Sequence, residues 1–282
     1  TSDPGVEASF SSNPTSLGAG SLQTVPLSIT FPDATPARVP IGVRFTMTST
    51  GNESVTDSEL VEFEVRQDHR WDIIATVDEK PADEATFMVP PGRSLTIPIN
   101  ATNTGNMADD LALDVQIEVL RSTGDGSQGW LASGGSVVDV GVNQSADLNV
   151  TASVSSEAWN GSVMSVTVTA TARDEVVMEF SFSLEVTHVP KWSVVANDAD
   201  LEIDPEGSQI ELALVQMGNS PSQPFASVYV TGENGWDIEV LGDLPIISPG
   251  GTSPLPLNIT PPDSAMHGRS VELHVRVREG DA

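Results

Sequence analysis

The sequence predicts an all-β fold of tandem immunoglobulin-like sandwiches, and three observations support this prediction. Apolar and polar residues alternate along short segments, turn-forming residues separate these segments, and the whole pattern recurs along the 282 residues. No segment keeps the 3.6-residue apolar period that a packed helix would show.

The alternation has a period of two, which is typical of strands with one buried face. It is clear in Leu95–Thr102, Glu179–Val186 and Val271–Val277, where every second residue is apolar. Clusters rich in Gly, Pro and Asn, such as Pro90–Gly92 and Asn103–Asn106, separate such segments and favour turns. The sequence therefore predicts half-buried antiparallel strands joined by short turns.

The sequence also matches itself at a fixed distance. A shift of 121 residues places Trp71–Ala75 on Trp192–Ala196, and Pro26–Thr30 on Asp147–Thr151, without a gap. A third copy is shorter, and its Pro256–Thr260 matches the same Leu-x-(Ile/Val)-Thr strand. A repeat of this length indicates a row of similar units.

The second copy predicts seven strands, the number in an immunoglobulin-like sandwich. On the repeat register, residues 1–69 form a partial sandwich with only the last four strands. Residues 70–189 form a complete sandwich, and residues 190–282 form one that lacks its last strand. The seven strands of the second copy are expected near residues 71–79, 94–102, 111–120, 130–140, 146–154, 163–172 and 176–188.

The first copy is expected to lack the facing half of its core. Its inward residues Leu27, Ile29, Val43 and Phe45 would then face water, which is costly. Either sequence outside these residues or another chain, by strand addition, would supply the missing strands. A first copy closed entirely by its own strands would contradict these boundaries.

Short motifs recur at equivalent places in the copies. Trp71 or Trp192 begins the first strand, an Asn-x-Gly-Asn turn at 103–106 follows the second strand, and a Gly-Trp pair precedes the fourth. With the Pro-Gly turn before Leu-x-Ile-Thr, these motifs resemble CARDB-type cell-adhesion-related domains and the immunoglobulin-like modules of secreted glycosidases. The resemblance implies tandem sandwiches on archaeal or bacterial surface proteins.

The composition excludes several classes of partner. With 40 Asp and Glu against 12 Lys and Arg, the formal net charge is −28. Such a surface lacks the clustered cations that nucleic acids and anionic lipids require, so no nucleic-acid partner is expected. The sequence contains no run of 18 or more apolar residues, so this segment is not expected to insert into a membrane. Without cysteine there is neither a disulfide nor a thiolate nucleophile.

No catalytic set is evident in the sequence. His69, His188, His267 and His274 fall in different copies or on different strands, and none recurs with a nucleophile and an orienting carboxylate. The chain is therefore not expected to be an enzyme. No cofactor is expected either, apart from the Ca²⁺ considered next.

One acidic loop is the candidate metal site. Asp198, Asp200, Asp204 and Glu206 bring four carboxylates close together in the sequence, and Ca²⁺ requires six to eight converging oxygens. The spacing is not that of an EF-hand loop. A solvated acidic loop is the favoured alternative, because a chain this acidic forms such clusters by composition alone.

Four further residues carry specific predictions. Trp71 and Trp192 are expected to be buried near unit junctions, because each begins a strand directly after a linker. Trp159 has no counterpart in the other copies and is the candidate ligand contact, for a sugar or a protein, with loop packing as the alternative. Gly105 is expected to adopt a positive φ in a tight turn.

Asn-x-Ser/Thr sequences are more frequent than the composition predicts. They make glycosylation a candidate modification, which would indicate an extracellular location, although a Ser/Thr-rich β surface is an equally good explanation. The six candidate sites are Asn52, Asn100, Asn143, Asn149, Asn160 and Asn258.

These observations favour a rigid, extracellular, non-enzymatic array that acts as a stalk, spacer, adhesin or surface-layer (S-layer) component. Its expected partners are other copies of itself or other surface proteins. One alternative is a carbohydrate-binding accessory module of a secreted hydrolase, with glycans as ligands. Another is a filament or lattice subunit whose partial sandwiches are completed by strand exchange.

Overall fold

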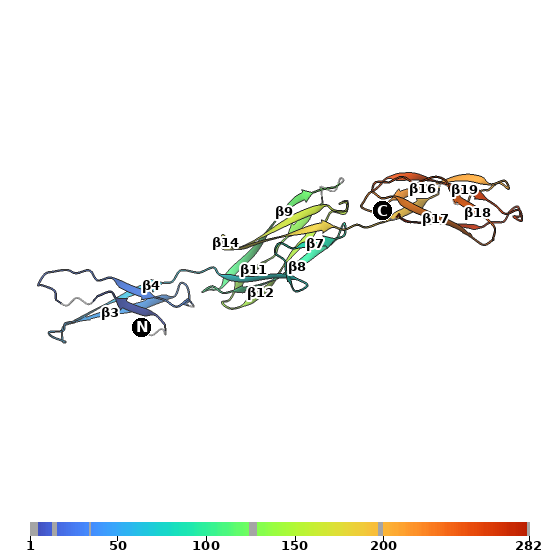
Figure 1. Ribbon diagram of the computed structural model, residues 1–282. Helices are drawn as coiled ribbons and strands as arrows, with labels where there is room; N and C mark the ends of the chain where they lie inside the picture. The colour runs from blue at the N-terminus through green and yellow to red at the C-terminus, as the bar shows by residue number, and fades with distance from the viewer. Residues whose placement is uncertain (1–4, 13–15, 34, 124–128, 197–199, 281–282) are drawn as a thin grey trace.

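The computed structural model describes residues 5–12, 16–33, 35–123, 129–196 and 200–280. All regular elements in these ranges are β-strands, which confirms the predicted fold class. The strands fall into an N-terminal group (β1–β4), a middle group (β5–β14) and a C-terminal group (β15–β20), which follow one another in an elongated row (Figure 1). Among these residues, no helix is long and apolar enough to span a membrane.

The middle group is a sandwich of two five-stranded sheets. The first sheet has the order β10-β12-β8-β5-β6, and the second has the order β11-β9-β13-β14-β7. Their bounds are β5 Trp71–Val77, β6 Lys80–Pro81, β7 Thr86–Val89, β8 Ser94–Asn103, β9 Asp109–Arg121, β10 Leu131–Ser133, β11 Ser136–Val140, β12 Ser145–Ser153, β13 Val163–Ala172 and β14 Glu175–Val186.

The core of the middle group lies between these sheets. Every second residue of β13 is buried, as the period of two predicts. Ile97 and Ile99 of β8 face Val166 of β13 and Phe182 of β14 across the core, and all four are buried. Because both faces contribute aliphatic and aromatic side chains, hydrophobic burial holds the two sheets together.

The middle group has more strands than the sequence predicted. The expected strand at 130–140 is split into β10 and β11, which lie in opposite sheets. Gly134 stands at this crossing, where a Cβ would lie 2.3 Å from the Leu113 carbonyl oxygen. The strand β7, which runs parallel to β14, was not predicted.

The C-terminal group has a four-stranded sheet of order β15-β16-β19-β18 and a β17–β20 pair. Leu214, Leu255 and Leu257 of the larger sheet are buried, whereas Val228 and Val275 of the pair are half-buried. The bounds are β15 Trp192–Val195, β16 Ser208–Gln216, β17 Pro224–Thr231, β18 Asp237–Val240, β19 Thr252–Thr260 and β20 Glu272–Glu279.

The N-terminal group consists of two separate strand pairs, β1 (Glu7–Phe10) with β2 (Leu27–Thr30) and β3 (Pro40–Thr48) with β4 (Thr56–Glu64). Met47 is 68% exposed, and Leu27, Ile29 and Phe45 are half-buried.

The inward residues of this group are less open to water than expected, because Leu27, Ile29 and Phe45 are half-buried. Val43 was expected to be open to water, but it is buried at 3% exposure. It lies near the start of β3, two residues after the buried Ile41.

Candidate functional site: the linker clasps

An asparagine of the middle group binds the linker that leads into it. Asn106 Oδ1 accepts a hydrogen bond of 2.8 Å from the Asp68 amide, and its Nδ2 donates one of 3.0 Å to the Arg66 carbonyl. The Asn106 carbonyl accepts a third bond from the Ala37 amide of the N-terminal group. The buried side chain of Asn106 thus fixes the linker, and the main chain of Asn106 contacts the preceding group.

The second linker is held in the same way. Asn219 Oδ1 accepts a bond of 2.7 Å from the Val189 amide, and its Nδ2 donates one of 2.7 Å to the Thr187 carbonyl. The Asn219 carbonyl accepts a bond of 2.8 Å from the Asn160 amide of the middle group. We call these two arrangements the first and second linker clasps.

A second amide three residues earlier shapes each clasp. Asn103 Oδ1 accepts from the Gly105 amide at 2.9 Å, and its Nδ2 donates to the Met107 and Val140 carbonyls. Gln216 Oε1 likewise accepts from the Gly218 amide at 2.7 Å. Both amides are fully buried and bonded at both ends, so each turn has one defined shape.

The glycine in each clasp is needed for space and not for its backbone angle. Gly105 does not adopt a positive φ, so the predicted reason for this glycine is wrong. A Cβ at Gly105 would lie 2.2 Å from the Asp68 carbonyl oxygen, and one at Gly218 would lie 2.5 Å from the Val189 carbonyl oxygen. The linker passes so close to the turn that no side chain fits between them.

A buried carboxylate reinforces the first clasp. Asp109 Oδ2 lies 2.7 Å from Nδ1 of His69 and 3.4 Å from Nε1 of Trp71. Its other oxygen accepts from Gln67 Nε2 at 3.4 Å and lies 4.0 Å from Nε of Arg173. Three residues of the linker region therefore converge on one carboxylate. Trp71 is buried, as predicted.

The second clasp has no such carboxylate. Ser222 stands three residues after Asn219, where Asp109 follows Asn106, and its hydroxyl accepts from Gln216 Nε2. Trp192 is only half-buried, which corrects the prediction for that residue, and its Nε1 has no hydrogen-bond acceptor. An exposed pair joins this junction instead, with His188 Nε2 2.7 Å from Glu279 Oε2.

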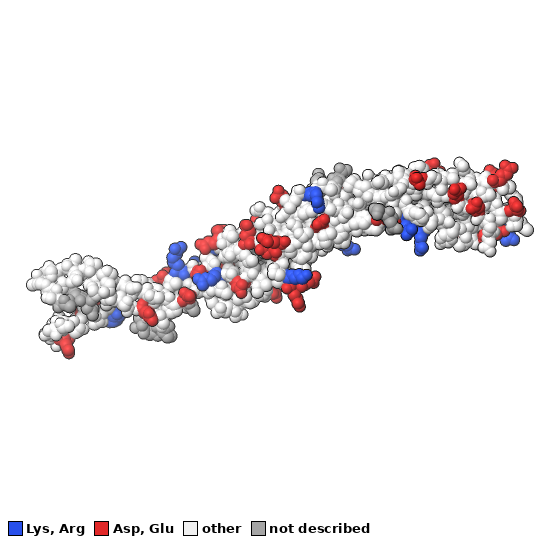
Figure 2. Space-filling view, in the orientation of Figure 1, with Lys and Arg blue, Asp and Glu red and all other residues white. Residues whose placement is uncertain are grey.

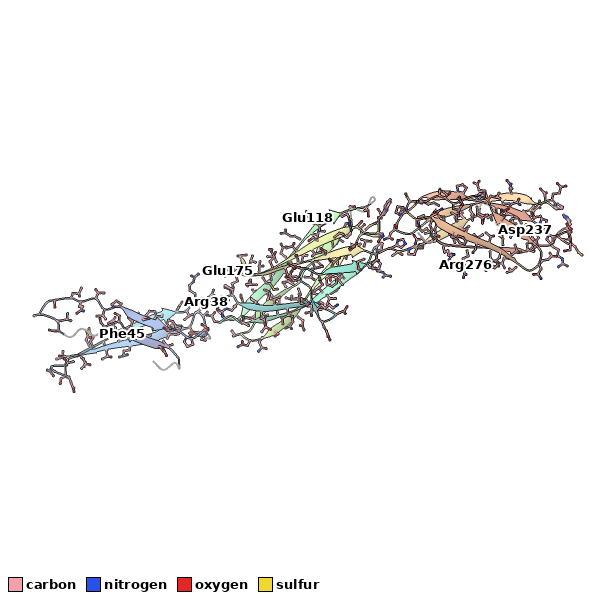
Figure 3. The ribbon with its side chains drawn as sticks, in the orientation of Figure 1. Arg38, Phe45, Glu118, Glu175, Asp237 and Arg276 are labelled. Atoms are coloured by element: carbon pink, nitrogen blue, oxygen red, sulfur yellow. The ribbon has the colours of Figure 1, made fainter. Side chains whose placement is uncertain are left out.

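An open cavity of about 410 Å³ adjoins the first clasp. Its lining carries both charges, from Arg38 and Arg66 and from Glu64 and Glu175; Arg38 and Glu175 are labelled in Figure 3. The mixture offers no concentrated charge of one sign. The cavity therefore resembles a solvated crevice between two packed groups more than a site built for one ion.

The candidate metal loop lies apart from the clasps. Asp198 falls outside the described residues, whereas Asp200, Asp204 and Glu206 are exposed. Among the residues that the structure describes, no three His, Asp or Glu side chains gather closely enough to hold a metal ion. The Ca²⁺ site remains a prediction, since Asp198 is one of its four proposed ligands.

Trp159 lies beside the second clasp. It is half-buried, and the next residue, Asn160, donates the main-chain bond to Asn219. Its assignment as a ligand contact stays a prediction, with junction packing as the competing role.

The six glycosylation candidates also remain predictions. Five of these asparagines are exposed, and Asn258 is half-buried. Asn100 donates a hydrogen bond of 2.9 Å to Asp147 on the neighbouring strand.

The sequence contained the signal for the clasps but not their role. Gly105-Asn106 and Gly218-Asn219 match in the repeat, so the motif was identified as a turn. The bonds from these asparagines reach residues 30 to 40 positions away, and local pattern does not reveal such partners. Asp109 has no matching acid in the third copy, so the repeat did not single it out.

Comparisons with known proteins give no family. No family model matches the chain, and no curated protein matches it. The resemblance to CARDB-type domains therefore remains an expectation.

Several solved β-sandwich structures show a weak likeness. A chaperone–tip adhesion subunit complex of Csu pili from Acinetobacter baumannii is 12% identical, covers 72% of this chain and 99% of its own, and has a TM-score of 0.38. Protocadherin gamma B2 extracellular domains 1–5 are 12% identical over 92% of this chain and 44% of theirs, with a TM-score of 0.35. The titin domains z1z2 in complex with telethonin are 15% identical over 73% and 94%, with a TM-score of 0.23.

Proposed function

We propose that this chain is a non-enzymatic, extracellular spacer or adhesive stalk whose three units, residues 1–69, 70–189 and 190–282, are held in a semi-rigid row. The observation that carries the proposal is the recurrence of the same amide clasp at both linkers. A flexible tether would not need a buried asparagine to bind both a donor and an acceptor of the linker. Clasped linkers instead restrict the rotation of one unit against the next.

The composition and surface support an extracellular role. The acidic surface, with Asp and Glu spread over all three groups, keeps such a chain soluble (Figure 2). The absence of cysteine means that its stability does not depend on disulfides. The exposed sequons are compatible with glycosylation, and partners on this proposal are surface proteins or further copies of the chain.

Removal of the clasps tests the spacer function directly. Asn106→Ala and Asn219→Ala should leave each unit folded but broaden the distribution of distances between units, measured by small-angle scattering or by fluorescence energy transfer between labelled outer units. Asn149→Ala, an exposed asparagine on β12, is the matched control and should change nothing. Unchanged distance distributions in both clasp variants would exclude a spacer held by these bonds.

The open N-terminal group favours a second candidate, a subunit completed by strand exchange. The inner residues Met47 of β3 and Val61 of β4 are exposed, and strand addition would cover them. Light scattering of the whole chain and of the chain without residues 1–64 separates the two candidates, because strand exchange through this group requires it.

The carbohydrate-binding alternative rests on Trp159. A glycan array with the wild-type chain and Trp159→Ala tests it. Binding that is lost in the variant would support this function and would contradict a purely structural role for that residue.

A further inference from the structure

The outer face of the β17–β20 pair carries aromatic and cationic side chains in register. Phe225 is the cross-strand partner of Arg278, and Tyr229 is the partner of His274. The guanidinium carbon of Arg278 lies 4.8 Å from the Phe225 ring centroid, and the Tyr229 and His274 rings stack at 4.9 Å. Phe225 and Tyr229 are 50% and 54% exposed. With Arg276, labelled in Figure 3, these residues form what we call the Arg–aromatic face.

This face is positively charged on a chain with a net charge of −28. Arg276 and Arg278 stand two residues apart on β20, and neither is ion-paired with a carboxylate of the described residues. Glu272 at the end of the strand approaches only His274, at 3.6 Å. Two guanidinium groups are therefore free to bind carboxylates of a partner.

The outer face of β9, β13 and β14 has the opposite character. Asp114 on β9 and Glu179 on β14 are both register partners of Thr169 on β13, so two carboxylates flank a strip of hydroxyl side chains. Glu118 extends the acidic row along β9. In the described parts of the chain, none of these three acids is ion-paired. We call this surface the acidic face; Glu118 is labelled in Figure 3.

We propose that the Arg–aromatic face of one chain docks on the acidic face of a second copy. Neighbouring strands are spaced about 4.8 Å apart in any sheet, so β20 above β9 places β17 above β13. The arginines then reach Asp114 and Glu118, while Phe225 and Tyr229 rest on the serine and threonine strip. Opposite charges meet on two preformed, flat surfaces.

Two features favour a protein surface over a polysaccharide as the occupant. Each exposed ring turns one face toward its cross-strand partner, Arg278 or His274, so the strip is not an open stacking platform for sugars. A long polyanion would also extend beyond this eight-residue strip onto the acidic surface around it and be repelled there.

The contact joins two different surfaces and therefore does not close on itself. Such heterologous contacts generate open rows or sheets of molecules. A two-stranded face is smaller than the roughly 800 Å² per partner of a standard stable interface, so each contact is weak. The proposal goes beyond the spacer function, which requires no contact between chains.

Sedimentation velocity over a concentration series tests the docking with two complementary variants. In low salt the wild-type chain should self-associate, and high salt should weaken the association, since surface charges are screened within about 8 Å at physiological ionic strength. Arg276→Gln/Arg278→Gln should raise the dissociation constant at least about tenfold, and so should Asp114→Asn/Glu118→Gln/Glu179→Gln. Arg93→Gln/Arg269→Gln removes the same charge from other exposed positions and should associate like the wild type.

Mixing the two interface variants gives the decisive result. Each retains one intact face, so the mixture should form one-to-one dimers and nothing larger. A wild-type chain that stays monomeric throughout would overturn the proposal, as would variants that associate as strongly as the wild type. Binding of a sulfated polysaccharide that depends on Arg276 and Arg278, without self-association, would also overturn it in favour of a glycan partner.

Discussion

The two linker clasps share one scaffold and differ in one residue. Asn106 and Asn219 make the same pair of bonds to their linkers. Three residues later the first clasp has the buried carboxylate of Asp109, and the second has Ser222. The difference shows that the amides set the path of the linker, whereas the carboxylate ties additional side chains to it.

This comparison predicts that the first junction is the stiffer one. Asp109 gathers His69, Trp71 and Gln67, so movement of the first linker would leave its buried carboxylate with only Arg173, 4.0 Å away. At the second junction the Trp192 indole N–H already lacks an acceptor, and the added pair is exposed. The middle unit is therefore expected to be bound more firmly at its start than at its end.

The largest expected effect comes from the two tryptophans. Trp71→Ala should lower the free energy of unfolding of the middle unit by about 3–5 kcal/mol, because a buried aromatic and its bond to Asp109 are both lost. Trp192→Ala should cost its own unit roughly 1–3 kcal/mol, since this side chain is half-buried and its N–H makes no bond. Chemical denaturation followed by hydrogen exchange assigns each loss to a unit. Equal losses at the two positions would contradict the comparison.

Substitution of Asp109, the residue that distinguishes the first clasp from the second, is the next test of the comparison. Asp109→Ser should destabilise the first junction by about 1–3 kcal/mol, because the buried Trp71 N–H loses its acceptor and the Gln67 amide keeps only the Ala108 carbonyl, at 3.5 Å. Protection of the residue 66–70 amides from hydrogen exchange should fall with it. The reverse change, Ser222→Asp, is the matched variant and should not stiffen the second junction, since Pro190 stands there in the place of His69 and has no side-chain donor. If the first linker were as well protected from hydrogen exchange in Asp109→Ser as in the wild type, the Asp109 carboxylate would not be what stiffens the first junction.

The sequence predicted the fold class and the repeat because both depend on local alternation. It did not predict Asp109 or the contacts of Asn106, whose partners lie about 40 residues away. Gly105 shows the limit most clearly. Turn chemistry suggested a positive φ, but the structure requires glycine because the linker carbonyl of Asp68 lies against it. A close approach between distant segments has no local signature.

The N-terminal and middle groups show the same limit in packing. Val61 of β4 is 38% exposed, whereas Phe182, at the matching position of β14, is 2% exposed. Alternation predicts which side of a strand is apolar in both cases. What covers that side depends on other strands, which in the middle group are those of the opposite sheet, such as β8 and β12.

The shared scaffold predicts a similar response to a methyl group in both clasps. Gly105→Ala and Gly218→Ala should each cost about 1–3 kcal/mol, because the new Cβ would overlap a linker carbonyl and force the strands apart. The variants should loosen the nearest junction and leave the other unchanged in a scattering or energy-transfer measurement. Gly51→Ala, where a Cβ meets no neighbour within 4 Å, is the control. A variant that is as stable as the control would mean that the linker does not lie against the turn.

The smallest effect is expected from removal of the His188–Glu279 pair at the second junction. His188 and Glu279 are 2.7 Å apart, but their side chains are 35% and 29% exposed, so water and salt screen the attraction. Pairs of this kind contribute at most about 1 kcal/mol, and His188→Gln should change the free energy of unfolding by no more than that. The distances between units should also stay as in the wild type, because Asn219 still holds Val189 and Thr187. If His188→Gln instead loosened the second junction as much as Asn219→Ala does, the ion pair and not the amide would hold that linker, and the two junctions would no longer share a common clasp.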